Sequence, residues 1–189
     1  MAKRTIISKA SAPNSHNNKH KGAPKRTPFS FEPITNYFIP DYSQPLISNP
    51  LMTTYHATSV NGSDGNLYSI QRIENVPNSA SVFWIRRWNH ILELSKAASP
   101  GLLNYFACHM EKSANTETSP LCLVSEFAAN TLRDIKGKLN LSLADAIRAM
   151  FQVSETLIDL KKQEHFHHCI NPDSIFVIEN QDRTYSYKL

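Results

Sequence analysis

The chain has 189 residues, of which 41% are hydrophobic, and its formal net charge is +4. This length suits one domain or one and a half, and the hydrophobic content is sufficient for a core. No segment approaches the roughly 18 apolar residues that cross a bilayer, and the N-terminus lacks an apolar signal region, so we expect neither a membrane anchor nor secretion. The three cysteines have no CxxC spacing, which favours a reduced cytoplasmic or nuclear protein over a disulfide or zinc scaffold.

The positive charge is concentrated at the N-terminus. Residues 1–26 carry seven Lys and Arg and no acid, which gives them a charge of +7. Because the whole chain carries +4, the remaining residues carry −3. Residues 1–30 are rich in Lys, Asn, Ser and Pro and lack periodicity, so they predict a disordered basic tail. This tail could bind RNA or serve as a nuclear address, but its scattered charges and lack of interleaved aromatic residues favour a solvated leader.

The next two segments predict a linker and the start of the folded part. Residues 31–52 contain four prolines among apolar residues, which indicates a partly ordered Pro-rich linker with one short edge strand. The folded part is expected to span 53–189. Its first element is an antiparallel hairpin, because β-branched and aromatic residues in 54–59 and 67–73 flank the turn-forming cluster 61–66.

The remaining predicted elements, in chain order, are a helix over 81–96, strands over 102–110 and 121–127, a long helix from Ser142, and a hairpin over 174–178 and 184–189. Ser142 and Asp145 have the spacing of a capping box at the start of the long helix. Its inward face is expected to consist of six apolar residues. These are Ile147, Met150, Phe151, Val153, Leu157 and Leu160.

Residues 166–177 resemble a protein-kinase catalytic loop that has lost its reactive groups. In an active kinase, the loop contains an Asp that accepts the substrate hydroxyl proton and, further on, an Asn that holds magnesium. When the loop is aligned on Pro172, Cys169 stands at the position of the kinase Asp, and Ser174 stands at the position of the Asn. Asn171 stands where the kinase loop has a Lys. The apolar residues of the kinase loop are kept, at Ile170 and at residues 175–177. This pattern predicts a pseudokinase, which is a kinase-like fold kept for binding without catalysis.

Two further kinase elements lack their expected residues. The glycine positions of the phosphate-binding loop fall near Ile47, Asn49 and Met52, and the Lys of the third strand is replaced by Gln71. Arg72 is expected on the opposite face of that strand, unless a one-residue bulge turns it inward.

The segment 121–127 resembles the strand that leads to the kinase hinge, where backbone groups near Glu126 to Ala128 could bond an adenine edge. The candidate nucleotide-binding residues are therefore Gln71, Glu126, Phe127, Asp173 and Ser174, and ATP binding without catalysis remains open. We predict no catalytic residue. We also predict no metal site, because the His165–Cys169 segment lacks a second pair of ligands.

Three stretches are similar to the pseudokinase regulatory subunit of the PAN poly(A)-nuclease deadenylation complex. They are 55–58 with 64–73, Trp88 in the following helix, and 171–175. The resemblance covers about residues 53–189. It implies an adaptor that recruits a catalytic deadenylase subunit to mRNA, with poly(A)-binding protein as a further partner and a homodimer in a full-length form. Gln71 and Ser174 differ from the residues that contact nucleotide in the family.

The predicted fold class is α+β. It comprises a protein-kinase-like N-lobe, with an antiparallel sheet and one helix, and the first part of the helical C-lobe, ending before the activation segment. The alternatives are another pseudokinase scaffold or a fragment of a divergent Ser/Thr kinase, for which Asp173 is the only acid in the loop. An RNA-binding module is a third alternative, although it would need aromatic platforms on the sheet.

Overall fold

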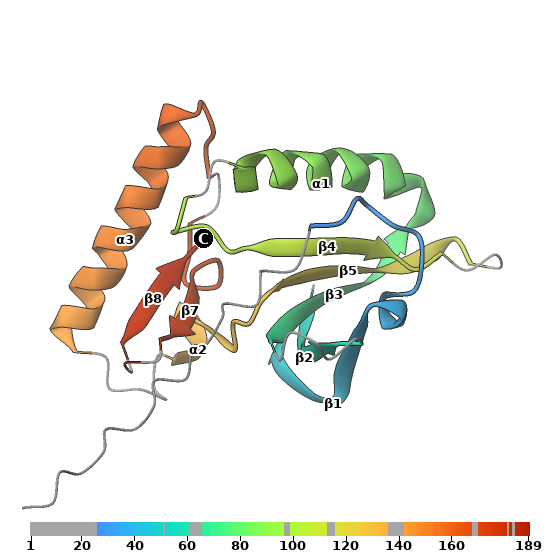
Figure 1. The fold of residues 1–189 in the computed structure, drawn as a ribbon, viewed down its shortest axis with the longest axis horizontal. Helices are drawn as coiled ribbons and strands as arrows, with labels where there is room; N and C mark the ends of the chain where they lie inside the picture. The colour runs from blue at the N-terminus through green and yellow to red at the C-terminus, as the bar shows by residue number, and fades with distance from the viewer. Residues whose placement is uncertain are drawn as a thin grey trace, which may run out of the picture.

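The computed structural model describes residues 26–50, 52–60, 66–96, 99–112, 116–135, 142–167, 170–180, 182 and 184–189. The predicted basic tail therefore lies outside the described residues up to position 25, as does most of the predicted turn at 61–66. The described residues form a five-stranded antiparallel sheet with a helix on it, followed by a long helix beside a three-stranded sheet (Figure 1). The α+β class is thus confirmed.

The larger sheet has the strand order β1-β2-β3-β5-β4. Its strands are β1 (Phe38–Ser48), β2 (Thr53–Ser59), β3 (Leu67–Pro77), β4 (Tyr105–Met110) and β5 (Thr118–Glu126), and the helix on it is α1 (Ser81–Lys96). The short 3-10 helices η1 (Ile34–Asn36) and η2 (Asn78–Ala80) precede β1 and α1. The predicted hairpin, the first helix and the two later strands are all present, with boundaries shifted by a few residues.

The segment 31–52 belongs to the sheet and is not a linker. Its strand β1 is 11 residues long and pairs with β2 from Phe38 opposite Ser59 to Ser48 opposite Thr53. The pairing is irregular around Pro40 and Pro45. Proline is tolerated because β1 is an edge strand, where a missing backbone donor on the outer side costs nothing.

The end of the predicted disordered tail lies along the free edge of β4. The backbone N–H of Thr27 donates to the Phe106 carbonyl over 2.9 Å, and that of Ser30 donates to the Cys108 carbonyl over 3.0 Å. Phe29, between them, packs against the apolar cluster beneath α1. Residues 26–30 are therefore ordered, because the open edge of β4 supplies backbone partners and the cluster supplies apolar contact.

Apolar side chains cover both faces of the larger sheet, as expected from the alternation of side chains along its strands. One face carries a cluster of Ile34, Phe38, Ala57, Tyr68, Ile70, Ala107, Cys122 and Val124. The other face, under α1, carries Val76, Trp88, Cys108, Met110, Leu121 and Leu123. Burial raises the pKa of the Cys122 thiol to about 12. Cys122 is therefore a core residue whose thiol is unreactive.

The second part of the fold is built around a long helix. The elements are β6 (Asn130–Thr131), α2 (Leu132–Ile135), α3 (Leu143–Lys162), β7 (Phe176–Glu179) and β8 (Tyr185–Lys188). The predicted capping box is confirmed, because Asp145 N–H donates to the Ser142 hydroxyl and Ser142 N–H donates to the Asp145 carboxylate, each over 3.1 Å. The helix α3 packs on β8 through the third apolar cluster, which includes Ala149, Val177 and Tyr187.

The prediction of the inward face of α3 is only half right. Leu160 is buried, and Val153 and Leu157 are partly buried against the third cluster. Ile147, Met150 and Phe151, also predicted to point inward, are exposed. The helix is apolar on two sides, and periodicity alone does not determine which of the two sides faces the core.

Candidate functional site

The five predicted nucleotide-binding residues lie on three separate elements. Gln71 is on β3 beneath α1, Glu126 and Phe127 are at the end of β5, and Asp173 and Ser174 are in the loop before β7. Each group has its own partners in the described structure. The sequence prediction therefore identified three places in the fold, and they are described in turn below.

Gln71 is a buried neutral residue. It is 4% exposed, and its Oε1 accepts a hydrogen bond from the Tyr105 hydroxyl over 3.4 Å. Burial raises the pKa of Tyr105, and the hydrogen bond to Gln71 lowers it in part. At pH 7 both side chains are uncharged, so this position offers no cation to a phosphate group.

Arg72 points away from Gln71, as the alternation along the strand predicts. The pairing of β3 with β5 is regular from Tyr68 to Ile73, and the irregularity lies beyond it, between Ile73 and Val76. On the far face, the Arg72 guanidinium donates to Glu74 over 2.5 Å and to the Tyr42 hydroxyl over 3.2 Å. The alternative of a bulge that turns Arg72 inward is therefore wrong.

The segment after β5 is bonded to the chain itself. The Ser69 hydroxyl accepts a hydrogen bond from the Ala128 N–H over 2.9 Å and donates to the Ala128 carbonyl over 3.3 Å. The Ser125 hydroxyl donates to the Glu126 carbonyl over 3.1 Å. Both serines are at most 1% exposed. The Glu126 carbonyl and both backbone groups of Ala128, which were expected near an adenine edge, therefore already have partners inside the protein.

We expect Ser69→Ala to lower the free energy of unfolding by about 2 kcal/mol, because it leaves two buried backbone groups of Ala128 without their partner. Chemical denaturation monitored by circular dichroism measures this loss. Ser43→Ala is a matched control, since Ser43 is exposed and its hydroxyl donates to nearby Asp41. A loss for Ser69→Ala no larger than that for the control would contradict the role of this hydroxyl.

The side chains of Glu126 and Phe127 also have partners. Glu126 Oε1 accepts from the Asn104 N–H over 2.8 Å and from the Lys188 ammonium over 2.6 Å. The Phe127 ring meets His56 edge to face, with ring centres 5.8 Å apart. These contacts hold the end of β5 against the start of β4, against β8 and against β2, which gives both residues a structural role.

The loop from Asn171 to Ser174 is closed by internal hydrogen bonds. The Asn171 Oδ1 accepts from the N–H groups of Asp173 (2.8 Å) and Ser174 (3.1 Å), and the Ser174 hydroxyl donates to the Asn171 carbonyl (3.0 Å). This is the arrangement of an Asx-turn. The residues at the kinase Lys and Asn positions, Asn171 and Ser174, therefore bond each other.

Asp173, the only acid in the loop, is paired outside it. Its carboxylate accepts from Arg133 Nε over 2.5 Å, and both side chains are more than half exposed. The Arg133 backbone N–H also donates to the Pro172 carbonyl over 3.1 Å. These contacts attach the loop to α2. Cys169 and His168 lie outside the described residues.

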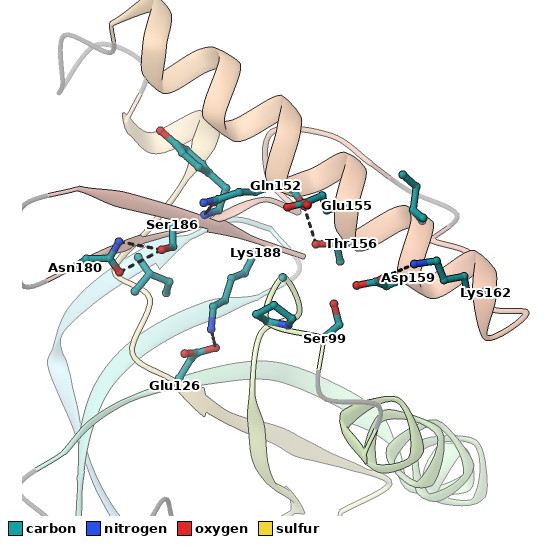
Figure 2. Close-up of a pocket in the computed structure, with 15 residues that line it drawn as sticks. Ser99, Glu126, Gln152, Glu155, Thr156, Asp159, Lys162, Asn180, Ser186 and Lys188 are labelled. Atoms are coloured by element: carbon teal, nitrogen blue, oxygen red, sulfur yellow. Dashed lines mark hydrogen bonds and ion pairs between the residues drawn. The ribbon is translucent and has the colours of Figure 1, made fainter. Parts of the chain in front are cut away.

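A polar pocket of about 660 Å³ lies between α3, the β7–β8 hairpin and the 99–101 loop. Figure 2 shows Gln152, Glu155 and Asp159 on its α3 side, and Lys188 extended toward Glu126 across it. The two lining lysines are paired, Lys188 with Glu126 over 2.6 Å and Lys162 with Asp159 over 3.1 Å. The sequence did not indicate this pocket, because its lining comes from four separated segments with no shared motif.

Within the described ranges, no three His, Cys, Asp or Glu side chains lie close enough to hold a metal ion. No helix of the described chain is long and apolar enough to cross a membrane. Comparison with protein-family models gives no match, and comparison with curated proteins gives none either. The functional argument therefore depends on the chain's own residues.

Proposed function

We propose that this chain is a catalytically inactive, protein-kinase-like adaptor. One observation carries the proposal: the Ser69 hydroxyl bonds both backbone groups of Ala128, where a kinase-like fold would receive adenine. Gln71, buried against Tyr105, and Ser174, bonded to Asn171, support it, because each stands where a kinase needs a reactive or charged group. Because the protein's own side chains occupy these positions through internal hydrogen bonds, the fold is better suited to protein binding than to phosphate transfer.

We further propose that the adaptor recruits a catalytic deadenylase subunit to mRNA, with poly(A)-binding protein as a further partner. This part is supported by the resemblance of 55–58, 64–73, Trp88 and 171–175 to the PAN regulatory pseudokinase. The basic residues in 1–26 could assist contact with RNA, because they carry all of the chain's excess positive charge.

The inactive state is tested by thermal unfolding with ATP, with and without magnesium. A ligand present at about 100 times its Kd stabilises a protein by about 2.7 kcal/mol, or roughly 5–10 °C for a chain of this size. We expect a shift below about 1 °C, since the groups that would bind ATP have internal partners. A shift of several degrees would show that ATP binds and would contradict the argument that these groups are already occupied, and the phosphotransfer assay would then decide whether the bound ATP reacts.

A phosphotransfer assay with radiolabelled ATP tests the divergent-kinase alternative. We expect no transfer to the chain or to a generic protein substrate. Transfer that Asp173→Ala abolishes and Glu179→Ala leaves unchanged would establish a divergent kinase, because Glu179 is also an exposed acid and lies outside the loop.

The deadenylase role needs a separate measurement. Purified chain is titrated into a catalytic deadenylase subunit, and the shortening of poly(A) RNA is followed over time. Faster shortening together with direct binding would support the role. If neither faster shortening nor binding is observed, the deadenylase partner is rejected. The proposal of an inactive adaptor would then depend on the two measurements with ATP.

A further inference from the structure

Residues 26–30 lie along the outer edge of β4, and they are joined to the fold there. The Thr27 N–H donates to the Phe106 carbonyl over 2.9 Å, and the Met110 N–H donates to the Ser30 carbonyl over 2.9 Å. Figure 1 shows this segment, in blue, between α1 and the edge of β4. Because it contacts only this edge and the apolar cluster under α1, it can detach while the five strands of the sheet stay paired.

Thr27 is held at all three of its hydrogen-bonding groups. Its N–H and its hydroxyl both donate to the Phe106 carbonyl, over 2.9 Å and 3.4 Å. Its own carbonyl accepts from Trp88 Nε1 over 3.1 Å. Beside it, Arg26 Nε donates to the Tyr105 carbonyl over 3.3 Å. A chemical change at Thr27 therefore acts directly on the contacts that hold the segment on β4.

Thr27 is followed by Pro28, and a hydroxyl residue before a proline is the acceptor pattern of proline-directed protein kinases. The residue before a proline is biased toward an extended backbone, which is the form in which a kinase groove takes up a peptide. Proline also has no N–H, so the groove need not supply an acceptor at that position. Pro28 is exposed, and Thr27 is half-buried only through its contacts with the fold.

The two other dipeptides of this kind are closed to a kinase. They are at 99–100 and 119–120. Ser119 is 2% exposed in β5, and Ser99 has a buried hydroxyl in the loop that packs on α3. Modification of either would require the sheet or the loop to open. Thr27 is the one acceptor of the three that becomes accessible when a short segment detaches.

We propose that Thr27 is a phosphorylation site for a proline-directed protein kinase, and that the phosphate keeps residues 26–30 detached from β4. In the transfer, the bond between the γ-phosphorus of Mg-ATP and its bridging oxygen breaks, and an ester bond to Thr27 Oγ1 forms. The hydroxyl proton passes to a base of the kinase, and ADP leaves. The inference is independent of the proposed adaptor role. Its consequence is that the outer edge of β4 and the apolar surface under Phe29 become exposed.

A phosphate on Thr27 is incompatible with the bound position of the segment. The ester oxygen has no proton to donate, so it would face the Phe106 carbonyl oxygen across the 3.4 Å that now separates donor and acceptor. A charge of about −2 would also lose water beside the half-buried side chain. The phosphate attracts Arg26 as well, which withdraws the guanidinium from the Tyr105 carbonyl. All three effects favour the detached segment.

Phosphorylation of the full chain by a purified mitogen-activated protein kinase with Mg-ATP tests the site, with tandem mass spectrometry to locate the phosphate. We expect modification at Thr27 that Thr27→Ala abolishes and that Pro28→Ala slows at least about tenfold. Ser99→Ala, at another of the three dipeptides, is the matched control and should leave the rate unchanged. Absence of transfer, or a phosphate at Ser99 or Ser119 in place of Thr27, would overturn the proposal.

The rate of modification also tests whether the detached segment is the substrate. Trp88→Phe removes the donor to the Thr27 carbonyl, so it should accelerate phosphorylation about threefold to tenfold. Arg87→Ala, at the exposed neighbouring position, should leave the rate unchanged. An equal or lower rate for Trp88→Phe would contradict modification through detachment, because a kinase acting on the bound segment would not respond to this contact.

Amide hydrogen exchange tests the effect of the phosphate. In the phosphorylated chain, the Ser30 and Met110 amides, which bond across the junction of the segment with β4, should exchange at least about tenfold faster. The centre of β5 should be unchanged. Thr27→Val is the matched variant, because it removes only the long hydroxyl bond, and its Ser30 exchange should stay within about threefold of the original chain. Unchanged Ser30 exchange in the phosphorylated chain would overturn the proposed release.

Discussion

Replacing Trp88 with alanine is expected to lower the free energy of unfolding by about 4 kcal/mol. Trp88 is among the largest fully buried side chains, at 1% exposed, and it fills the cluster between α1 and the sheet. Its Nε1 also donates to the Thr27 carbonyl over 3.1 Å, which ties the N-terminal segment to α1. Chemical denaturation measured by circular dichroism gives the loss directly.

Two companion variants divide the Trp88 effect into its causes. Trp88→Phe keeps most of the apolar volume but removes the donor to Thr27, so we expect a loss of about 1–2 kcal/mol. Arg87→Ala, at the exposed neighbouring position, should change stability by less than about 0.5 kcal/mol. Equal losses for Trp88→Phe and Trp88→Ala would show that burial of the ring is not the main contribution.

The Trp88 contact also has a local consequence. Residues 26–30 are held on β4 by backbone hydrogen bonds, by Phe29 and by the Trp88 donor. Amide hydrogen exchange at Ser30 should therefore accelerate more in Trp88→Phe than exchange in the centre of β5 does. Uniform acceleration across the sheet would mean that the segment opens only with global unfolding.

The local elements were predictable from the sequence because their signals are local. The hairpin around 61–66 has a turn cluster between β-branched runs, and the start of α3 has the Ser142–Asp145 capping box. In each case the residues that determine the structure are within a few positions of each other. The α+β class follows from the order of such elements.

The long-range contacts were not predictable in the same way. Ser69 and Ala128 are 59 positions apart, and Trp88 and Thr27 are 61 apart. No periodicity links such pairs. The sequence therefore suggested that the backbone groups of Ala128 were open to a ligand and that Thr27 was disordered, whereas both form hydrogen bonds within the structure. Similarly, the two apolar sides of α3 could be assigned only after β8 was placed against one of them.

Gly101 is the second position where a single substitution should have a large effect. It lies in the loop between α1 and β4, where its carbonyl accepts the Leu189 N–H over 2.9 Å. A Cβ added at Gly101 would lie 1.6 Å from Oγ1 and 2.9 Å from Cβ of Thr156 on α3. No other residue fits there without moving either the loop or the helix.

We expect Gly101→Ala to lower the free energy of unfolding by about 3 kcal/mol, at the upper end of overpacking effects. Thr156 cannot easily turn away, because it is β-branched and its hydroxyl donates to the Gln152 carbonyl over 2.8 Å. Thermal unfolding should report a decrease in Tm of roughly 6–12 °C.

The contact between Gly101 and Thr156 makes a double-mutant cycle informative. Thr156→Ala removes the atom in closest conflict, so Gly101→Ala should cost about 1.5–2 kcal/mol less in the Thr156→Ala background than in the original chain. That coupling would place the loop against α3 in solution, as the structure has it. Additive losses would mean that the clash is relieved elsewhere, and that the 99–101 loop is not held against α3.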